Sequence, residues 1–187
     1  MIFKYQYLYK IIMFEILNYY FDLLVVWYYF VLLRAFEFFH NTMVKMDRYR
    51  LINDRQDKEP YLERYYIFIK ERGNFPFNIF LHKFLKSDPD DLHDHPWSYT
   101  TIILRGGYWE HTKNDKDEII KKWWGPGTIR RSPATQLHRI ELDSNKAGTK
   151  EVWTLFIPGT KQREWGFETI NGWIDNEKYL EEKKKDN

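Results

Sequence analysis

The chain has 187 residues, a length typical of one domain and enough to bury a sizeable core. Its 29 Lys and Arg are interspersed with 27 Asp and Glu, giving a net charge of +2 without a basic stripe, so we expect no nucleic-acid partner. The absence of cysteine excludes disulfides, thiolate metal sites and a cysteine nucleophile, and it fits a reducing, cytoplasmic location. Any metal must therefore be bound by His or carboxylate side chains.

Residues 1–45 differ in composition from the rest of the chain. They are rich in Tyr, Phe and Ile, whereas every glycine lies at or after Gly73 and every proline at or after Pro60. The longest uninterrupted apolar run, Leu23 to Leu33, has eleven residues. A membrane span needs about 20 residues, so this run is short for one.

Three interpretations of residues 1–45 are open: a mis-chosen start codon with initiation at Met43 or Met46, a weak membrane anchor, or an amphipathic docking helix. We favour the first, because AT-rich non-coding sequence would translate into Tyr, Phe, Ile, Lys and Asn. We accordingly divide the chain into an extension, residues 1–45, and a functional domain, residues 46–187. A membrane partner, or anchoring at a membrane, is expected only if the extension is genuine.

Residues 46–187 have the pattern of an all-β domain, with short β-branched and aromatic runs separated by turn residues about every ten positions. Gly106-Gly107 predicts a hairpin between two of these runs. The tail, residues 177–187, is predicted to be a charged helix end or a disordered, solvated terminus. The spacing favours a single sandwich or small barrel. The predicted strands are 62–70, 77–86, 97–105, 108–113, 118–124, 128–131, 137–142 and 151–157.

Three histidines carry the strongest chemical signal. In an extended chain His93 and His95 face the same side while Asp94 faces away, so one metal ion could contact both imidazoles. An isolated H-x-H is also consistent with a structural pair near a strand end. On the predicted strand 137–142, His138 shares a face with Ile140, which indicates an inward-facing imidazole.

The spacing of these histidines resembles the two motifs of the cupin superfamily. The first is G, five residues, H-x-H, three or four residues, E, six residues, G; the second is G, five residues, P-x-G, two residues, H, three residues, N. In the first motif His93, His95 and Gly106 fall in place, with Ser87 at the leading glycine. The second motif is matched by Gly127, Pro133 and His138, with Thr135 in place of Gly and Leu142 in place of Asn.

The resemblance covers roughly residues 60–160 and implies a cupin-type antiparallel β-barrel, also called a double-stranded β-helix or jelly roll. It implies that His93, His95 and His138 are metal ligands. The family's metal-binding glutamate would fall at Tyr99 or Thr100, neither of which is a carboxylate. A three-His site resembles the thiol dioxygenase branch, including cysteine dioxygenase, in which three neutral imidazoles hold ferrous iron.

The sequence is also similar to small, mostly uncharacterised cupins of bacteria and large DNA viruses. We therefore expect a metal-binding cupin, with Fe(II) as the metal and Zn, Ni, Mn or Cu as alternatives. The expected function is a non-haem iron dioxygenase or related oxidoreductase acting on a small anionic substrate. Two alternatives remain open: a non-enzymatic barrel that binds a metal or small molecule, and a nucleotide-sugar isomerase or epimerase. A homodimer is also left open.

Two further residues are predicted to be catalytic. Tyr99 shares the face of the histidines and could donate a hydrogen bond to a bound substrate, although it could equally be core filler. Arg105 continues the same parity and is the favoured partner for an anion. His82 is predicted to be either a core or a pocket residue, and His111 a surface residue. Other candidates are Arg130, Arg131, Arg139 and Arg163 as cations, and Trp165-Gly166-Phe167 and Gly172-Trp173 as a lid.

Overall fold

The computed structural model describes residues 2–54, 57–88 and 91–185, and the chain divides into two compact units, residues 1–46 and 47–187. The first unit is a single helix, α1 (Ile2–Lys45). From Met13 to Lys45 this helix is long and apolar enough to cross a membrane, judged by length and composition alone. Its apolar side chains in this stretch are largely exposed.

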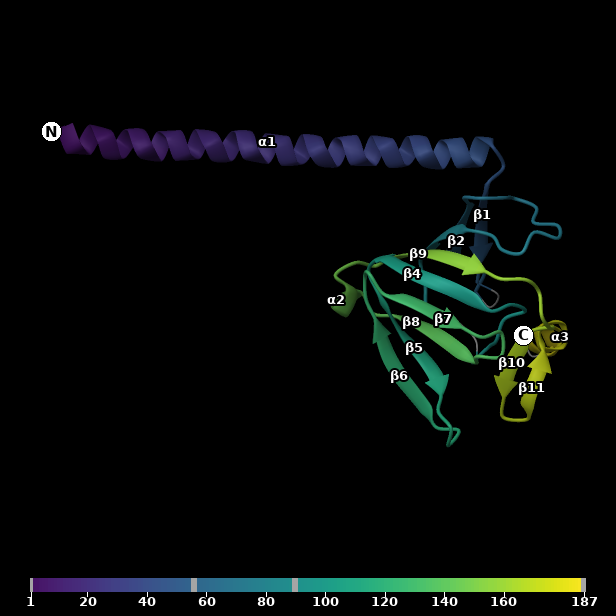
Figure 1. Ribbon diagram of the computed structural model, residues 1–187. Helices are drawn as coiled ribbons and strands as arrows, with labels where there is room; N and C mark the ends of the chain where they lie inside the picture. The colour runs from purple at the N-terminus through teal and green to yellow at the C-terminus, as the bar shows by residue number, and fades with distance from the viewer. Residues whose placement is uncertain (1, 55–56, 89–90, 186–187) are drawn as a thin grey trace. The chain divides into compact units, whose positions relative to one another are not determined.

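The second unit is built mainly from antiparallel strands (Figure 1). A six-stranded sheet has the order β1-β2-β3-β9-β4-β7, and a three-stranded sheet has the order β6-β5-β8. The strands of the larger sheet are β1 (Tyr49–Asn53), β2 (Pro60–Tyr66), β3 (Phe80–Phe84), β4 (Tyr99–Arg105), β7 (Ile129–Ser132) and β9 (Val152–Pro158). Those of the smaller sheet are β5 (Tyr108–Lys113), β6 (Ile119–Trp124) and β8 (His138–Leu142).

The two sheets face each other, with β5, β6 and β8 below β4 and β9 in the view of Figure 1. Alternation places every second side chain between them, as in β4, where Tyr99, Thr101 and Ile103 are buried. Burial of this apolar surface stabilises the pair of sheets. The buried cluster takes residues from both sheets: Leu62, Phe84, Ile103, Tyr108, Ile140 and Val152.

All eight predicted strands are present, with ends shifted by a few residues. The pattern did not predict β1, nor the separate hairpin of β10 (Gly166–Thr169) and β11 (Gly172–Asp175). Two short helices complete the unit, α2 (Ser144–Ala147) and α3 (Asn176–Lys185). The expectation of a predominantly antiparallel β domain is therefore confirmed.

The hairpin predicted at Gly106-Gly107 is wrong. β4 pairs with β7 and β9, whereas β5 pairs with β6 and β8, so the two glycines carry the chain from one sheet to the other. Gly106 has a φ of 77°, and a Cβ there would lie 2.8 Å from the carbonyl oxygen of Glu151. Glycine is therefore needed for a tight crossing between sheets, which has the same local signal as a hairpin turn.

The tail is a charged helix where the structure describes it, as one of the two alternatives predicted, and one residue anchors it to the domain. Tyr179 of α3 is buried and stacks on Phe167, with ring centroids 4.0 Å apart. Its hydroxyl donates a hydrogen bond to Asp91 at 3.1 Å. The helix thereby fixes the β10–β11 hairpin against the segment that leads into the histidines.

Candidate metal centre

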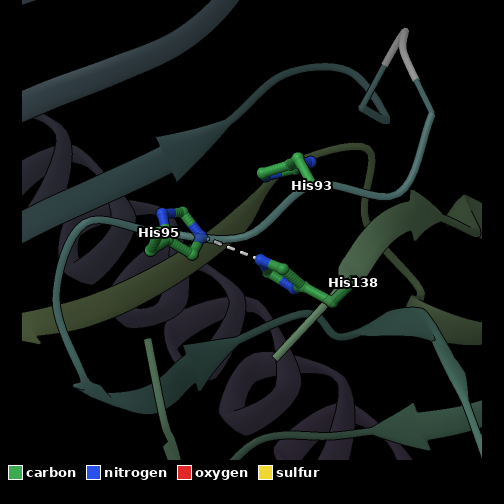
Figure 2. A group of neighbouring side chains, drawn as sticks. All are labelled: His93, His95 and His138. Atoms are coloured by element: carbon green, nitrogen blue, oxygen red, sulfur yellow. Dashed lines mark hydrogen bonds between the residues drawn. The ribbon is translucent and has the colours of Figure 1, made fainter. Parts of the chain in front are cut away.

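The three histidines converge from two elements. His93 and His95 lie on the segment before β4, and His138 begins β8. The backbones of His93 and His138 exchange two hydrogen bonds of 2.9 Å, which fixes the loop against the strand. Figure 2 shows the three imidazole rings gathered around one space. One nitrogen from each ring lies within 4.8 Å of the others, and the Nε2 atoms of His95 and His138 are 2.8 Å apart.

This geometry fits a metal ion. Two nitrogens that each lie about 2.1 Å from one ion are roughly 3.0–3.4 Å apart when they occupy neighbouring coordination positions. The observed separation of 2.8 Å needs only a small adjustment of side-chain torsions to reach that range. Three imidazoles and no thiolate form a donor set that suits Fe, Zn, Cu and Ni.

Asp94, the residue between His93 and His95, faces away from the histidine cluster because its carboxylate has partners elsewhere. It is 1% exposed and lies outside the histidine cluster. Its carboxylate accepts hydrogen bonds from the backbone nitrogen of Gly166 at 2.8 Å and from the Trp173 indole at 3.1 Å, and it pairs with Arg163 at 3.2 Å. The carboxylate thus ties the histidine segment to the β10–β11 hairpin, and its alternation with the two imidazoles fixes their direction.

A cavity of about 320 Å³ adjoins the three histidines. Trp165 and Phe167 line it, so part of the predicted lid does lie at this site. Trp173, which was grouped with them, instead packs over Asp94 and is 41% exposed. The lining thus combines aromatic walls with the three imidazoles and several further polar side chains, the mixture typical of a ligand-binding cavity. The aromatic residues of the lining are Tyr61, Phe84, Trp97, Tyr99, Tyr108, Phe156, Trp165 and Phe167.

His95 is held in the neutral form that a metal ligand requires. Burial lowers its pKa well below the usual value of 6.5, and the neighbouring His138 and His93 lower it further. A neutral imidazole offers its lone pair without first losing a proton, so metal binding at His95 is not opposed by protonation near neutral pH.

Tyr99 lines the cavity, as predicted from its position on the same face of the chain as His93 and His95. Its hydroxyl is 3.3 Å from Nε2 of His138, and its ring packs against that of His95 with centroids 4.8 Å apart. Burial raises the pKa of Tyr99 to about 12, so the hydroxyl stays protonated at neutral pH. The side chain is therefore a hydrogen-bond donor beside the three imidazoles.

Arg105 does not point into the cavity, and that prediction is wrong. Its side chain is exposed and is not part of the lining. The pairing of β4 with β9 shifts register between Ile103 and Arg105, and such a bulge breaks the inside-outside alternation on which the prediction depended. Of the other arginines considered, Arg130 alone belongs to the cavity lining; Arg131, Arg139 and Arg163 lie outside it.

Sequence reasoning missed a second arginine of the cavity lining, Arg64 on β2. Its Nε donates to Nε2 of His82 at 3.0 Å, and its guanidinium lies 4.9 Å from the ring centre of Phe80. Burial and the charge of Arg64 lower the pKa of His82 well below 6.5, so His82 is a neutral acceptor. His82 is thus a pocket residue. The sequence could have indicated this position, because Arg64 lies two residues after the buried Leu62 on the same strand and therefore faces the same side.

A second missed residue is Glu110 on β5, whose side chain is 3% exposed. Its Oε1 accepts from Nδ1 of His138 at 2.9 Å and from Arg130 at 2.6 Å, while its Oε2 accepts from the Trp124 indole at 2.9 Å. Burial alone would raise the pKa of Glu110, but the hydrogen bond with His138 and the adjacent guanidinium lower it, so the carboxylate is ionised. The sequence could have indicated an inward-facing Glu110, because it lies two residues after the buried Tyr108 on the same strand.

No family model matches the sequence, and no curated protein matches it either. Among solved structures the chain is similar to a cupin-2 domain protein from Rhodospirillum rubrum, with 11% identity, a TM-score of 0.49, and coverage of 66% of this chain and 78% of that one. It is similar to a cupin-like protein from Thermotoga maritima, with 15% identity, a TM-score of 0.44, and coverage of 64% and 83%.

A third similar structure is hydroxypropylphosphonic acid epoxidase from S. wedmorenis, with 11% identity, a TM-score of 0.44 and coverage of 60% of this chain. The chain spans only 56% of the length of that enzyme. The structural neighbours of this chain are thus cupin domains and cupin-like enzymes, and a three-histidine cluster is present in its cavity.

Proposed function

We propose that His93, His95 and His138 bind a divalent transition metal, Fe(II), and that the protein is a dioxygenase-type oxidoreductase acting on a small anionic molecule. We infer that the two facing sheets form the cupin barrel around this centre. The observation that carries the proposal is the convergence of three imidazole nitrogens within 4.8 Å at the wall of a cavity.

The ligand set supports a reactive metal centre. Three protein ligands leave coordination positions open for other molecules. When bound, ferrous iron supplies the redox chemistry by which dioxygen reacts with an organic substrate. The protein's part is to hold the imidazoles in place, to keep His95 neutral and to surround the open side with aromatic rings that exclude water.

An anionic substrate is favoured by charge. Neutral imidazoles leave the full +2 charge of a bound ion uncompensated by its ligands, which favours a thiolate or carboxylate as a further ligand. Arg64 adds a half-buried cation on the cavity wall. Nearby on the same wall, the hydroxyl of Thr154 is buried without a hydrogen-bond partner among the described residues, so it can serve a polar ligand group.

The proposal is tested by measuring oxygen uptake with Fe(II)-loaded protein over a panel of small thiols and carboxylates, with and without 2-oxoglutarate. We expect uptake that requires Fe(II) and a substrate but no 2-oxoglutarate. Uptake only in the presence of 2-oxoglutarate would contradict the proposed chemistry. No uptake across a broad panel, in protein that binds metal, would favour the non-enzymatic binding barrel.

The role of Arg64 is tested with Arg64→Met and, as a matched control, Arg105→Met at an exposed position. Loss of a charge-assisted hydrogen bond to substrate costs about 1.5–3 kcal/mol, so KM should rise roughly ten- to hundredfold in the first variant. KM should not change in the second. An equal KM in both variants would place anion recognition elsewhere.

A further inference from the structure

The carboxylate of Glu110 contacts the second ring nitrogen of one of the three histidines. The contact atom is Nδ1 of His138, whereas Nε2 of the same ring faces His95 and Tyr99. An ionised carboxylate can only accept, so the His138 proton lies on Nδ1. The lone pair of Nε2 is then directed at the space shared with the other two imidazoles.

Arg130 contacts the same carboxylate oxygen. Its guanidinium lies 2.6 Å from Oε1 of Glu110, the atom that accepts from His138. Both side chains are almost fully buried, at 9% and 3% exposed. One carboxylate oxygen therefore serves two donors, and the guanidinium offsets the negative charge of Glu110. The carboxylate thus orients the ring of His138 while its own charge is balanced by Arg130.

The Trp124 indole completes the arrangement by donating to Oε2 at 2.9 Å. All three donors therefore reach the carboxylate from fixed positions on β6, β7 and β8, while Glu110 itself is on β5. The side chain has no freedom to turn away from His138. The direction of the Glu110 carboxylate relative to His138 is therefore fixed by three contacts.

We propose that Glu110 and Arg130 act as a charge-balanced positioning pair for His138: Glu110 accepts from Nδ1 and so presents Nε2 to the metal, and Arg130 balances the charge of the carboxylate and holds it in place. This inference rests on the proposed metal centre but not on the proposed reaction. Its consequence is that metal affinity depends on Glu110, whereas the affinity of the bound metal for an anion depends on Arg130.

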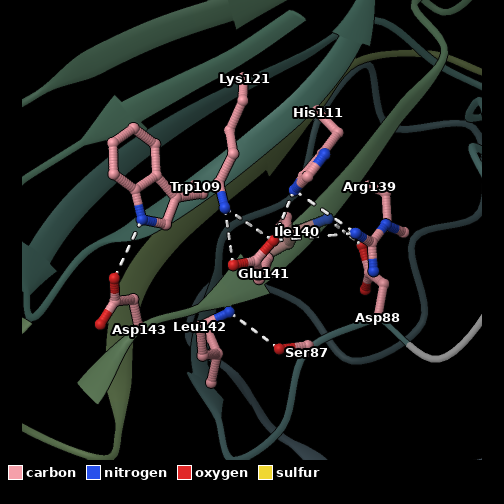
Figure 3. Close-up of polar contacts among 10 residues, drawn as sticks. All are labelled: Ser87, Asp88, Trp109, His111, Lys121, Arg139, Ile140, Glu141, Leu142 and Asp143. Atoms are coloured by element: carbon pink, nitrogen blue, oxygen red, sulfur yellow. Dashed lines mark hydrogen bonds and ion pairs between the residues drawn. The ribbon is translucent and has the colours of Figure 1, made fainter. Parts of the chain in front are cut away.

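The outer face of the same strands supplies a matched control. There Glu141 accepts from Nε2 of His111 at 2.7 Å and also pairs with Lys121 (Figure 3). Neither residue belongs to the lining of the metal-site cavity. Glu141→Gln therefore removes a glutamate–histidine contact from β5 and β8 without touching the proposed centre.

The direct readout is the His138 tautomer, measured by nitrogen NMR of histidine-labelled, metal-free protein. We expect the wild type to carry its proton on Nδ1, and Glu110→Gln to show a mixture, because the amide must also face the Trp124 donor. Loss of packing alone would not change the tautomer. A His138 that carries its proton on Nε2 in the wild type would overturn the inference whether or not metal binds.

The second readout is the affinity for Co(II), followed by its absorption spectrum, with thermal unfolding as a check on folding. Glu110→Gln should weaken Co(II) binding roughly 10- to 100-fold, the usual effect of removing a group that orients a ligand. Glu141→Gln should bind Co(II) as the wild type does. Equal affinities in all three proteins would contradict the inference, whereas failure of the wild type to bind Co(II) would contradict the metal centre itself.

Arg130→Met tests the charge of Arg130 separately from the orientation of His138 by Glu110. This variant should retain Co(II), but azide should bind to the Co(II) protein about tenfold more weakly, because a positive charge near the centre has been removed. Azide affinity equal to that of the wild type would show that Arg130 does not balance the charge of Glu110.

Discussion

The two faces of the β5–β8 pair carry the same two residue types in opposite positions. On the inner face Glu110 of β5 contacts His138 of β8, and on the outer face His111 of β5 contacts Glu141 of β8. The inner side chains are 3% and 4% exposed, whereas the outer ones are 16% and 32% exposed. Residue type alone therefore does not distinguish the pair at the proposed metal centre from a glutamate–histidine contact at the surface; burial and the neighbouring imidazoles do.

The physical consequence is a difference in the strength and role of each contact. Water and salt screen the outer pair, and Lys121 shares its carboxylate. The inner pair is desolvated, so each charged group there depends on its partner. We expect substitutions on the inner face to change stability and metal binding together, and those on the outer face to change little.

The largest expected effect on stability comes from Glu110→Gln. It leaves Arg130 buried without its counter-charge, so the free energy of unfolding should fall by about 3 kcal/mol. Glu141→Gln should lower it by less than about 1 kcal/mol, and by less still at high salt. Urea unfolding of the two variants measures both values. Similar losses would mean that the two faces do not differ as their burial indicates.

A second effect concerns pH and the buried His82. Its pKa in the folded protein lies well below 6.5, the value expected in the unfolded chain. Below pH 6.5 the unfolded state therefore binds a proton that the folded state does not, and stability falls as the pH is lowered through this window. The contribution approaches about 1.4 kcal/mol per pH unit.

Urea unfolding of metal-free protein between pH 7.5 and 5 measures that dependence. His82→Gln should reduce the slope of the free energy of unfolding against pH, below pH 6.5, by the equivalent of up to one bound proton. Part of the slope should remain because the pKa of His95 is also lowered. If wild type and His82→Gln lost stability in parallel, His82 would not be the neutral buried group that its contact with Arg64 indicates.

The smallest expected effect concerns α1. Because residues 47–187 form a compact unit of their own, a chain that starts at Met46 should be soluble and monodisperse, and its unfolding midpoint should match that of the full chain. Gel filtration and thermal unfolding measure these properties. Aggregation or a clearly lower midpoint of the shorter chain would make α1 part of the folded domain.

Local alternation and turn residues were sufficient to predict the eight strands and the inward direction of His93, His95 and His138. They were not sufficient where a contact depends on how distant strands align. The bulge after Ile103 turned Arg105 outward, and the Glu110 contact depends on the register between β5 and β8. Parity alone could have placed Arg64 and Glu110 inside, but not their partners.

The most direct test of the account is the metal content of purified protein. Wild type and His111→Ala should each contain close to one equivalent of a divalent transition metal, whereas the double variant His93→Ala/His138→Ala should contain almost none while keeping its circular dichroism spectrum. Metal content in the folded double variant equal to that of the wild type would contradict the three-histidine centre.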